Sequence, residues 1–414
     1  MKIGNVVTSV GRSGFFNWDM MALKRGAKPN GFLMEGEPIT PGFKSIIQPG
    51  TALSIMLILD DGQVAFGDCV DVIFTGAAGR DPLFDATEQS KRFATDVRER
   101  LIGRDVGRFR EIAREFDELT IAGRKLHTAL RFGLTQALLH AASLANTCTM
   151  AEVIAREYDS QISRTTIPIL ASCLDDAPML DRMILKQAEL LPHAAIVDVD
   201  RDLGRDGGKL LGYAKKVVDR IAEIGADGYR PIIHLDVYGT LGELYEGDLE
   251  RVAEFLRKLE ETVKPHDLMV EAPVMMKSRE DQIRAFSELR AAISRKGSRV
   301  RIIADEWCNT LEDIKVFVDA KAADLVQVKM PDLGGINNTI EAVLYARNGD
   351  VGASLGGTGN ETDQSTRITA HIALACQPTF MLSKPGFGGD EALMMQTNEM
   401  LRTLALINTQ RRRS

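Results

Sequence analysis

Three acidic residues each follow a short apolar run, and their spacing is regular. Asp236, Glu271 and Asp305 are separated by 35 and 34 residues, about one strand–helix unit each. If the apolar runs are neighbouring parallel strands, the three carboxylates meet at one edge, where like charges repel or take up protons. A divalent cation relieves this, and an all-oxygen ligand set favours a hard ion such as Mg²⁺. We therefore expect a Mg²⁺ site, although three salt-bridged structural acids remain the alternative.

A lysine closes the next apolar run. Lys329 lies 24 residues after Asp305. Beside a metal and partly desolvated, a lysine is expected to have a lowered pKa and to serve as a neutral base. The alternative role is a countercharge for the acids. Gln327 lies two residues earlier, so in a strand it shares the face of Lys329 and offers amide hydrogen bonds to a ligand.

His193 is a candidate for a second proton-transfer group. It follows Leu191-Pro192 at the end of a weakly bounded apolar run. A single histidine is more often structural. If a strand ends there, however, its imidazole faces the same site from nearly the opposite side to Lys329. A lysine and a histidine that flank one carbon can move protons on either face of it.

Two glycine-containing segments are candidate ligand loops. Residues 356–362 read Gly-Gly-Thr-Gly-Asn-Glu-Thr and precede a predicted helix, which is typical of a site for an anion such as a carboxylate. No Gly-Lys-Ser/Thr follows, so this is not a P-loop. Residues 75–82 read Thr-Gly-Ala-Ala-Gly-Arg-Asp-Pro and form either a lid over the site or a simple turn.

These residues need strands that all end at one face. From residue 167 onward, eight short apolar runs alternate with amphipathic helical segments, a number and size that match a (β/α)₈ TIM-like barrel. The runner-up is a doubly wound open sheet, but no Gly-x-Gly-x-x-Gly follows the first run. The predicted strands are 167–173, 190–198, 231–237, 268–274, 300–306, 325–330, 352–356 and 379–383, and the predicted helices include 208–224, 249–264, 278–295, 310–320, 336–347, 361–375 and 391–407.

The first part of the chain has a different pattern. Apolar alternation predicts strands at 2–8, 52–59 and 63–70, with a hairpin turn at Asp60-Asp61-Gly62. Helical periodicity follows at 83–101, 105–118, 127–145 and 150–157. We expect residues 1–160 to form an α+β capping domain and residues 161–414 to form the barrel.

Composition excludes several classes of protein. With 44% hydrophobic and 26% charged residues, the 414-residue chain is globular rather than disordered or collagen-like. A net charge of −7 argues against nucleic acid as a partner. No apolar run approaches the roughly 20 residues of a membrane span, and the N-terminus has no secretory h-region. Five scattered cysteines without a CxxC pair are typical of a reduced cytoplasmic protein.

The strand-end acids and Lys329, behind an α+β cap, resemble the enolase superfamily, for which a Lys or His base beside Mg²⁺ is established chemistry. Within it, the chain resembles the methylaspartate ammonia-lyase family. The resembling segments span nearly the whole chain in order: 76–82, 191–193, 234–239, 305–310, 331–335 and 356–362.

The resemblance implies a mechanism. Mg²⁺ on the three acids binds the substrate carboxylate, and Lys329 abstracts the neighbouring proton. Gln327 and His193 help to stabilise the resulting enolate, and His193 is the base for the epimeric substrate. Ammonia then leaves. The family also implies a homodimer, a small amino-acid-like substrate and a monovalent cation such as K⁺.

The chain departs from the family pattern on the amine-binding side. Ile73 and Ser172 each stand where the family has glutamine, and Gly359 stands where it has cysteine. Two further positions, Leu170 and Ser354, replace aromatic residues. Two lost hydrogen bonds to a charged group cost about 3–6 kcal/mol, or on the order of 10²–10⁴ in turnover of methylaspartate.

The substrate-binding residues that match the family are Thr358 and Leu382. The proton-abstracting half of the site is therefore expected to be intact and the amine-holding half to be rebuilt, with Ile73 favouring a more apolar or bulkier group. The main prediction is a lyase acting on 3-methylaspartate or a related amino acid. The alternatives are an enolase-type dehydratase or epimerase and, with least support, a non-enzymatic binding protein on the same scaffold.

Overall fold

The N-terminal part is built on a three-stranded antiparallel sheet. The computed structural model describes residues 1–76, 79–174, 176–384, 386 and 388–411. In the sheet, β4 (Ile47–Leu59) pairs with β1 (Ile3–Trp18) on one side and with β5 (Val64–Cys69) on the other. The predicted turn at Asp60–Gly62 joins β4 to β5 and is confirmed. Strand β1 is longer than predicted.

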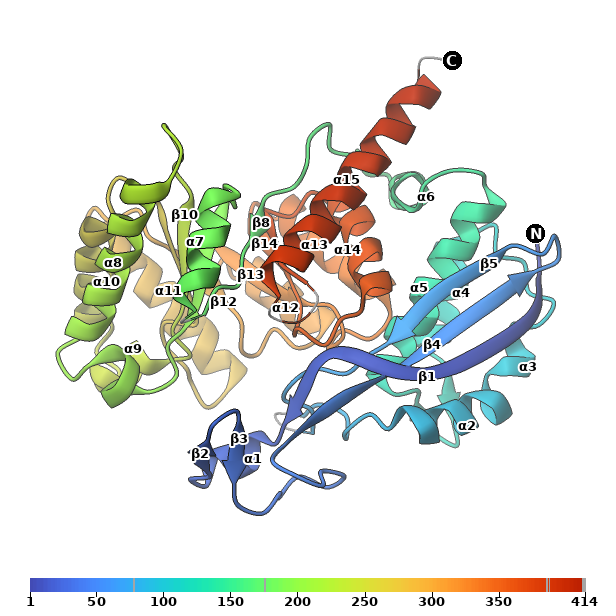
Figure 1. Ribbon diagram of the computed structural model, residues 1–414, viewed down its shortest axis with the longest axis horizontal. Helices are drawn as coiled ribbons and strands as arrows, with labels where there is room; N and C mark the ends of the chain where they lie inside the picture. The colour runs from blue at the N-terminus through green and yellow to red at the C-terminus, as the bar shows by residue number, and fades with distance from the viewer. Residues whose placement is uncertain (77–78, 175, 385, 387, 412–414) are drawn as a thin grey trace.

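Helix α5 (Thr128–Ala145) joins the sheet to the rest of the molecule (Figure 1). It packs on β4 and β5 and also contacts α13 and α14 of the barrel. Two glycines make the approach possible, because a Cβ at Gly67 would overlap the carbonyl of Gly133, and a Cβ at Gly133 would overlap Cys69. The remaining N-terminal elements are α1 (Met20–Lys24), β2 (Lys28–Asn30), β3 (Leu33–Glu35), α2 (Ala86–Asp96), α3 (Arg98–Leu101), α4 (Phe109–Asp117), β6 (Thr120–Ile121), β7 (Arg124–Lys125) and α6 (Met150–Glu157).

Eight parallel strands close into a barrel in the order of the sequence, which confirms the predicted fold and rules out the open sheet. The closure runs from β15 back to β8. Three of the strands end in a charged residue: Asp236, Glu271 and Lys329. The strands are β8 (Ile169–Leu170), β9 (Leu190–Ala195), β10 (Ile232–Asp236), β11 (Leu268–Glu271), β12 (Arg301–Ala304), β13 (Leu325–Lys329), β14 (Gly352–Gly356) and β15 (Phe380–Leu382).

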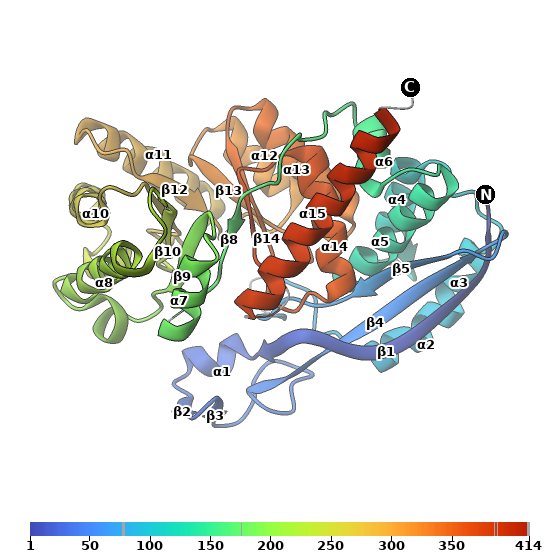
Figure 2. The same cartoon turned by 45° about the horizontal axis from the view of Figure 1, so that its top comes forward.

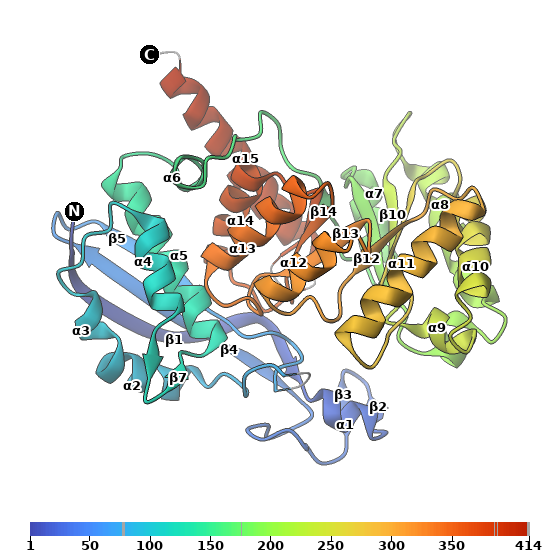
Figure 3. The same cartoon turned by 180° about the vertical axis from the view of Figure 1, so that it is seen from behind.

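Helices follow most of the strands, and Figures 2 and 3 show them around the barrel. The segment predicted at 208–224 is a helix with the same bounds. Helix α7 and the short elements α9 and η1 were not predicted. The elements of this part are α7 (Ala177–Leu185), the π-helix η1 (Val199–Leu203), α8 (Gly208–Ile224), α9 (Thr240–Leu244), α10 (Leu249–Val263), α11 (Arg279–Arg295), α12 (Leu311–Asp319), α13 (Ile336–Asn348), α14 (Asp363–Cys376) and α15 (Gly389–Arg411).

The unpredicted hairpin β2–β3 and helix α1 form a projection at the end of the sheet remote from the N-terminus (Figures 1 and 2). Asp19 caps α1 and also accepts hydrogen bonds from the backbone of Ile39 and Thr40, which fixes the base of this projection. Across the described residues, no helix combines the length and apolarity that a membrane crossing requires.

Candidate active site

The barrel places the predicted acids side by side. Asp236 closes β10 and is in register with Glu271, which closes β11. Asp305 follows β12 directly. All three side chains are buried, with 2–5% of their surface exposed. This arrangement follows from the parallel strands, whose carboxyl ends form one face of the barrel.

Burial and mutual repulsion disfavour the charged forms of these acids. The pKa of Asp236 is raised well above its usual range by burial and by the charges of Glu271 and Asp305. Burial raises the pKa of Asp305 to about 7, although Lys329 opposes this. A bound dication would stabilise the ionised forms of both groups. Three buried oxygen ligands at one mouth therefore fit Mg²⁺.

The pKa of Glu271 shifts in the opposite direction to those of Asp236 and Asp305. Burial disfavours its charge, but the imidazole of His234 outweighs this and the pKa of Glu271 falls to about 2. The two side chains approach to 3.1 Å, between His234 Nε2 and Glu271 Oε2. On the other side, Gln327 Nε2 donates to Glu271 Oε1 at 3.0 Å. Gln327 therefore orients a carboxylate, while its own Oε1 has no partner among the described residues.

Lys329 lies against Asp305 rather than free in the site. Its Nζ is 2.7 Å from Asp305 Oδ1 and 2.8 Å from Oδ2. Burial lowers the pKa of Lys329, but the carboxylates of Asp305 and Glu306 outweigh this and raise it above its usual value. The expected lowering of the pKa concerns a lysine beside a bound metal ion, so it stays a prediction. Lys329 is a charged partner of Asp305 in this arrangement.

His193 lies at the site with its backbone in the left-handed region, at φ 56°. Its Nδ1 is 3.1 Å from the hydroxyl of Ser172, so the ring is held from the side of β8. Burial, together with His234, lowers the pKa of His193 to about 4. The imidazole is therefore neutral near pH 7. Ser172, predicted to bind substrate, is the group that orients His193.

The segment after β14 is held by a buried ion pair. Both carboxylate oxygens of Glu361 accept from the backbone N–H of Thr358, at 3.1 and 3.2 Å. Lys384 Nζ lies 3.7 Å from Glu361 Oε1, and neither side chain has any exposed surface. Gly359 has a φ of 84°, and its carbonyl accepts from Gly386 N–H. The predicted substrate residues Thr358 and Gly359 thus sit on a loop with a rigid support.

Two other predicted substrate residues come from opposite parts of the molecule. Leu382 ends β15, beside that loop, and is buried. Ile73 belongs to the N-terminal domain, where its carbonyl accepts from Trp18 N–H. The Ile73 side chain is half-buried, and its place at the site stays a prediction.

The segment predicted as a lid or a turn is only partly described, because residues 77 and 78 lie outside the described residues. Arg80, near its end, reaches the barrel. Its Nε is 3.0 Å from both carboxylate oxygens of Asp332, and a terminal nitrogen donates to Asn309 Oδ1 at 3.3 Å. Both charged side chains are largely buried, which ties the capping domain to the loop after β13.

Sequence reasoning gave no role of their own to three residues of this site, His234, Glu361 and Lys384, although it singled out the 356–362 segment that contains Glu361. A signal existed for His234, because it lies two residues before Asp236 and strand alternation puts both on one face. No comparable signal exists for the other two, since only the folded chain brings Glu361 and Lys384 together.

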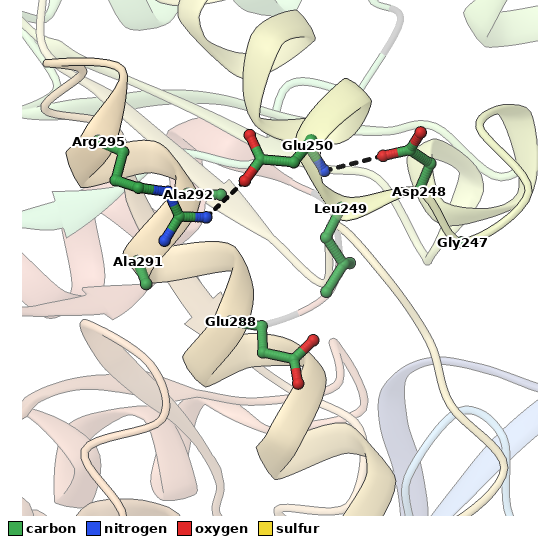
Figure 4. Close-up of a pocket in the computed structure, with 8 residues that line it drawn as sticks. All are labelled: Gly247, Asp248, Leu249, Glu250, Glu288, Ala291, Ala292 and Arg295. Atoms are coloured by element: carbon green, nitrogen blue, oxygen red, sulfur yellow. Dashed lines mark hydrogen bonds and ion pairs between the residues drawn. The ribbon is translucent and has the colours of Figure 1, made fainter.

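A cavity of about 380 Å³ lies away from these residues, between α10 and α11 (Figure 4). Three of its charged groups already have partners, as Arg295 pairs with Glu250 and Asp248 caps α10. None of the predicted site residues lines it. Its lining residues are Gly247, Asp248, Leu249, Glu250, Glu288, Ala291, Ala292 and Arg295.

Comparisons with known proteins find relatives along the whole chain. The family models described as methylaspartate ammonia-lyase N-terminus and C-terminus match residues 1–159 and 161–409. Methylaspartate ammonia-lyase 2 of Carboxydothermus hydrogenoformans is 51% identical over 409 residues, which are 98% of this chain and 99% of that protein.

Solved structures of the same family superpose along the whole chain. The Mg complex of beta-methylaspartase from Clostridium tetanomorphum has a TM-score of 0.96 and 43% identity, covering 99% of this chain and 100% of that one. The Citrobacter amalonaticus methylaspartate ammonia lyase containing (2S,3S)-3-methylaspartic acid has a TM-score of 0.97 and 44% identity, again with 99% and 100% coverage.

A more distant structure shares the fold alone. Muconate lactonizing enzyme from Pseudomonas fluorescens is 18% identical, with a TM-score of 0.60 over 90% of this chain and 85% of that one. On the full-length family matches, this chain belongs to the methylaspartate ammonia-lyase family of the enolase superfamily and is an ammonia-lyase.

Proposed function

We propose that this ammonia-lyase is Mg²⁺-dependent and eliminates ammonia from 3-methylaspartate or a closely related amino acid. The observation that carries the proposal is the group of three buried carboxylates, Asp236, Glu271 and Asp305, with Lys329 in direct contact with one of them. Two relatives support it, since one is described as a Mg complex and another contains (2S,3S)-3-methylaspartic acid.

The three carboxylates would hold the ion. When bound there, Mg²⁺ supplies a Lewis acid that polarises the substrate carboxylate and makes the neighbouring C–H acidic. The chain's own contribution is to fix the ligands before substrate arrives. Gln327 does this for Glu271 through its amide, and Lys329 does so for Asp305.

In the proposed reaction Lys329 Nζ accepts the proton next to that carboxylate. This requires Lys329 to leave its ion pair with Asp305 and to lose its own proton. His193 approaches from the side of β9, and Ser172 holds its Nδ1, so its neutral Nε2 is the atom available for the epimeric substrate. The Gly359 N–H is the candidate partner for the far carboxylate, because the Thr358 N–H already donates to Glu361.

Ser172 and Ile73 bear on which amino acid is the substrate. Ser172 is committed to His193, at 3.1 Å, so its hydroxyl is a poor replacement for an amide that holds an amine. Ile73 offers no polar atom on its side chain. We therefore propose that the preferred substrate carries a more apolar or bulkier group than 3-methylaspartate on this side.

The decisive experiment is a proton NMR assay of the purified protein with Mg²⁺, K⁺ and threo-3-methylaspartate. Formation of mesaconate and ammonia, abolished in Lys329→Ala and by removal of the metal with EDTA, is the expected result. If wild-type turnover is weak, Ile73→Gln with Ser172→Gln should raise it by on the order of 10²–10⁴, the magnitude of two hydrogen bonds to a charged group. Absence of ammonia from every 3-substituted aspartate tested would contradict the proposal.

A dehydratase or epimerase on the same scaffold gives different products. Release of an unsaturated acid without ammonia would point to loss of water, and solvent deuterium in recovered substrate would point to epimerisation. For the assembly we propose a homodimer in the cytoplasm, and light scattering of the purified protein tests the first part by its mass, which should be twice 45.5 kDa.

A further inference from the structure

Three neighbouring strands bring two imidazoles and a carboxylate together in the barrel. His193 comes from β9, His234 from β10 and Glu271 from β11. One ligand atom from each lies within 4.8 Å of the others. The two imidazole centroids are 5.4 Å apart, and His234 Nε2 is 3.1 Å from Glu271 Oε2.

Three buried polar atoms of this cluster have no hydrogen-bond partner among the described residues: His234 Nδ1, His234 Nε2 and Glu271 Oε2. His234 is fully buried. Buried polar atoms are rarely left unpaired, and an unpaired one costs about 1–3 kcal/mol. His234 Nε2 and Glu271 Oε2 lie 3.1 Å apart, which is an ion-pair distance when the imidazole is protonated.

Two other polar atoms of the cluster, His193 Nδ1 and Glu271 Oε1, have hydrogen-bond partners. The hydroxyl of Ser172 lies 3.1 Å from His193 Nδ1, and Gln327 Nε2 donates to Glu271 Oε1 at 3.0 Å. These contacts leave His193 Nε2 and Glu271 Oε2 as the available atoms. Ligands fixed from behind by such partners are a general property of metal sites, because orientation and basicity of the ligand depend on them.

The donor set selects a different ion from the three-carboxylate group. Imidazole nitrogen suits Zn²⁺ and other first-row transition metals, and two histidines with a glutamate form a known zinc ligand set that leaves a fourth position open. Mg²⁺ prefers oxygen and is not expected on imidazoles. We propose that His193, His234 and Glu271 form a second metal site, specific for a transition-metal dication such as Zn²⁺.

Occupancy of this site would inhibit the enzyme, and this consequence rests on the proposed function. A zinc ion on His193 Nε2 takes the lone pair that the proposed proton transfer uses. It also recruits Glu271, which the Mg²⁺ site needs. Inhibition by micromolar zinc at saturating Mg²⁺ is therefore the expected behaviour of the wild-type protein.

Zinc binding is tested directly on the purified full-length protein with saturating Mg²⁺ present. Equilibrium dialysis should give one Zn²⁺ per chain, and X-ray absorption of that sample should show two imidazoles at about 2.0 Å. His234→Gln and His193→Gln should each weaken zinc binding by at least about 100-fold. Loss of a residue that only orients a ligand weakens metal binding by about 10–100-fold, and loss of a ligand itself should cost at least as much.

Two control variants separate this site from other sources of binding. His266→Gln removes a buried imidazole that lies elsewhere, on the carbonyl of Pro231, and should leave zinc binding unchanged. Asp305→Asn removes a proposed Mg²⁺ ligand that is not part of the cluster, and should not weaken zinc binding.

Zinc affinity that survives both histidine substitutions but falls in Asp305→Asn would overturn the inference, because zinc would then simply occupy the carboxylate site. A spectrum without imidazole in the wild type would overturn it independently of any variant. A protein that binds zinc as expected but releases no ammonia from any substrate would contradict the proposed function and leave the metal site standing.

Discussion

The buried ion pair beneath the 356–362 loop leads to a quantitative prediction. Lys384 and Glu361 have no exposed side-chain surface, and Lys384 Nζ has the sulfur of Met330, at 3.3 Å, as its other neighbour. Burial lowers the pKa of Lys384, and the Glu361 carboxylate opposes that shift. Each charge is therefore tolerated only because of the other.

Lys384→Met keeps the length of the side chain and removes its charge. Glu361 is then a buried, uncompensated anion, and we expect the free energy of unfolding to fall by about 3–5 kcal/mol. The double variant Lys384→Met with Glu361→Gln has no net buried charge, and the amide oxygen still accepts from Thr358 N–H. Most of the lost stability should return.

Urea unfolding of the three proteins measures these differences, with Lys215→Met as the matched control. Lys215 pairs with Asp219 on the surface, where both side chains are at least 60% exposed, so its loss should cost less than about 1 kcal/mol. The reasoning is refuted if Lys384→Met is no more destabilising than Lys215→Met, or if the double variant is as unstable as the single one. Because the pair supports Thr358, the single variant should also raise KM more than it lowers kcat.

Three further predictions concern other contacts. Burial raises the pKa of Asp71 to about 6, so the folded state binds an extra proton between about pH 4 and 6. The free energy of unfolding therefore falls by about 3 kcal/mol as pH rises through that window. The difference in this free energy between the wild type and Asp71→Asn should change by that amount between pH 4 and 7, and an equal difference at both pH values would contradict the prediction. Arg80→Lys keeps the charge but not the two-pronged contact with Asp332, and should lower kcat/KM by about 10–100-fold in steady-state assays, where an unchanged value would contradict a role for this contact. Gly357→Ala places a Cβ on the buried ion pair and should destabilise by about 1–3 kcal/mol in thermal unfolding, whereas Gly212→Ala, with open space around it in α8, should not; equal effects would show that the loop adapts.

Much of the catalytic half of the site could be predicted from local sequence. Each of Asp236, Glu271 and Asp305 ends or follows a short apolar run, and the run-to-run distance matches one strand and one helix. Because parallel strands end at a common face, these two facts predict that the acids lie close together, without knowledge of any contact. Helix 208–224 was equally predictable, since its apolar positions repeat with the helical period.

The N-terminal domain was less predictable. The sheet was expected, but the projection formed by α1, β2 and β3 was not, because its elements are three to five residues long and carry too little periodicity. The position of Ile73 relative to the barrel could not be predicted either. The sequence marks it as a departure from the family, yet its distance from the barrel residues depends on how two domains pack.

The sequence by itself determined the strand order, the acidic residue types at the strand ends and membership of the family, because these depend on local patterns and on residue identity. Only the tertiary structure decided which charges are paired. Lys329 is held charged by Asp305 from the next strand, His234 faces Glu271, and Lys384 meets Glu361 from 23 residues away in the chain. The protonation of a buried group depends on neighbours that arrive from other strands, and no local pattern contains them.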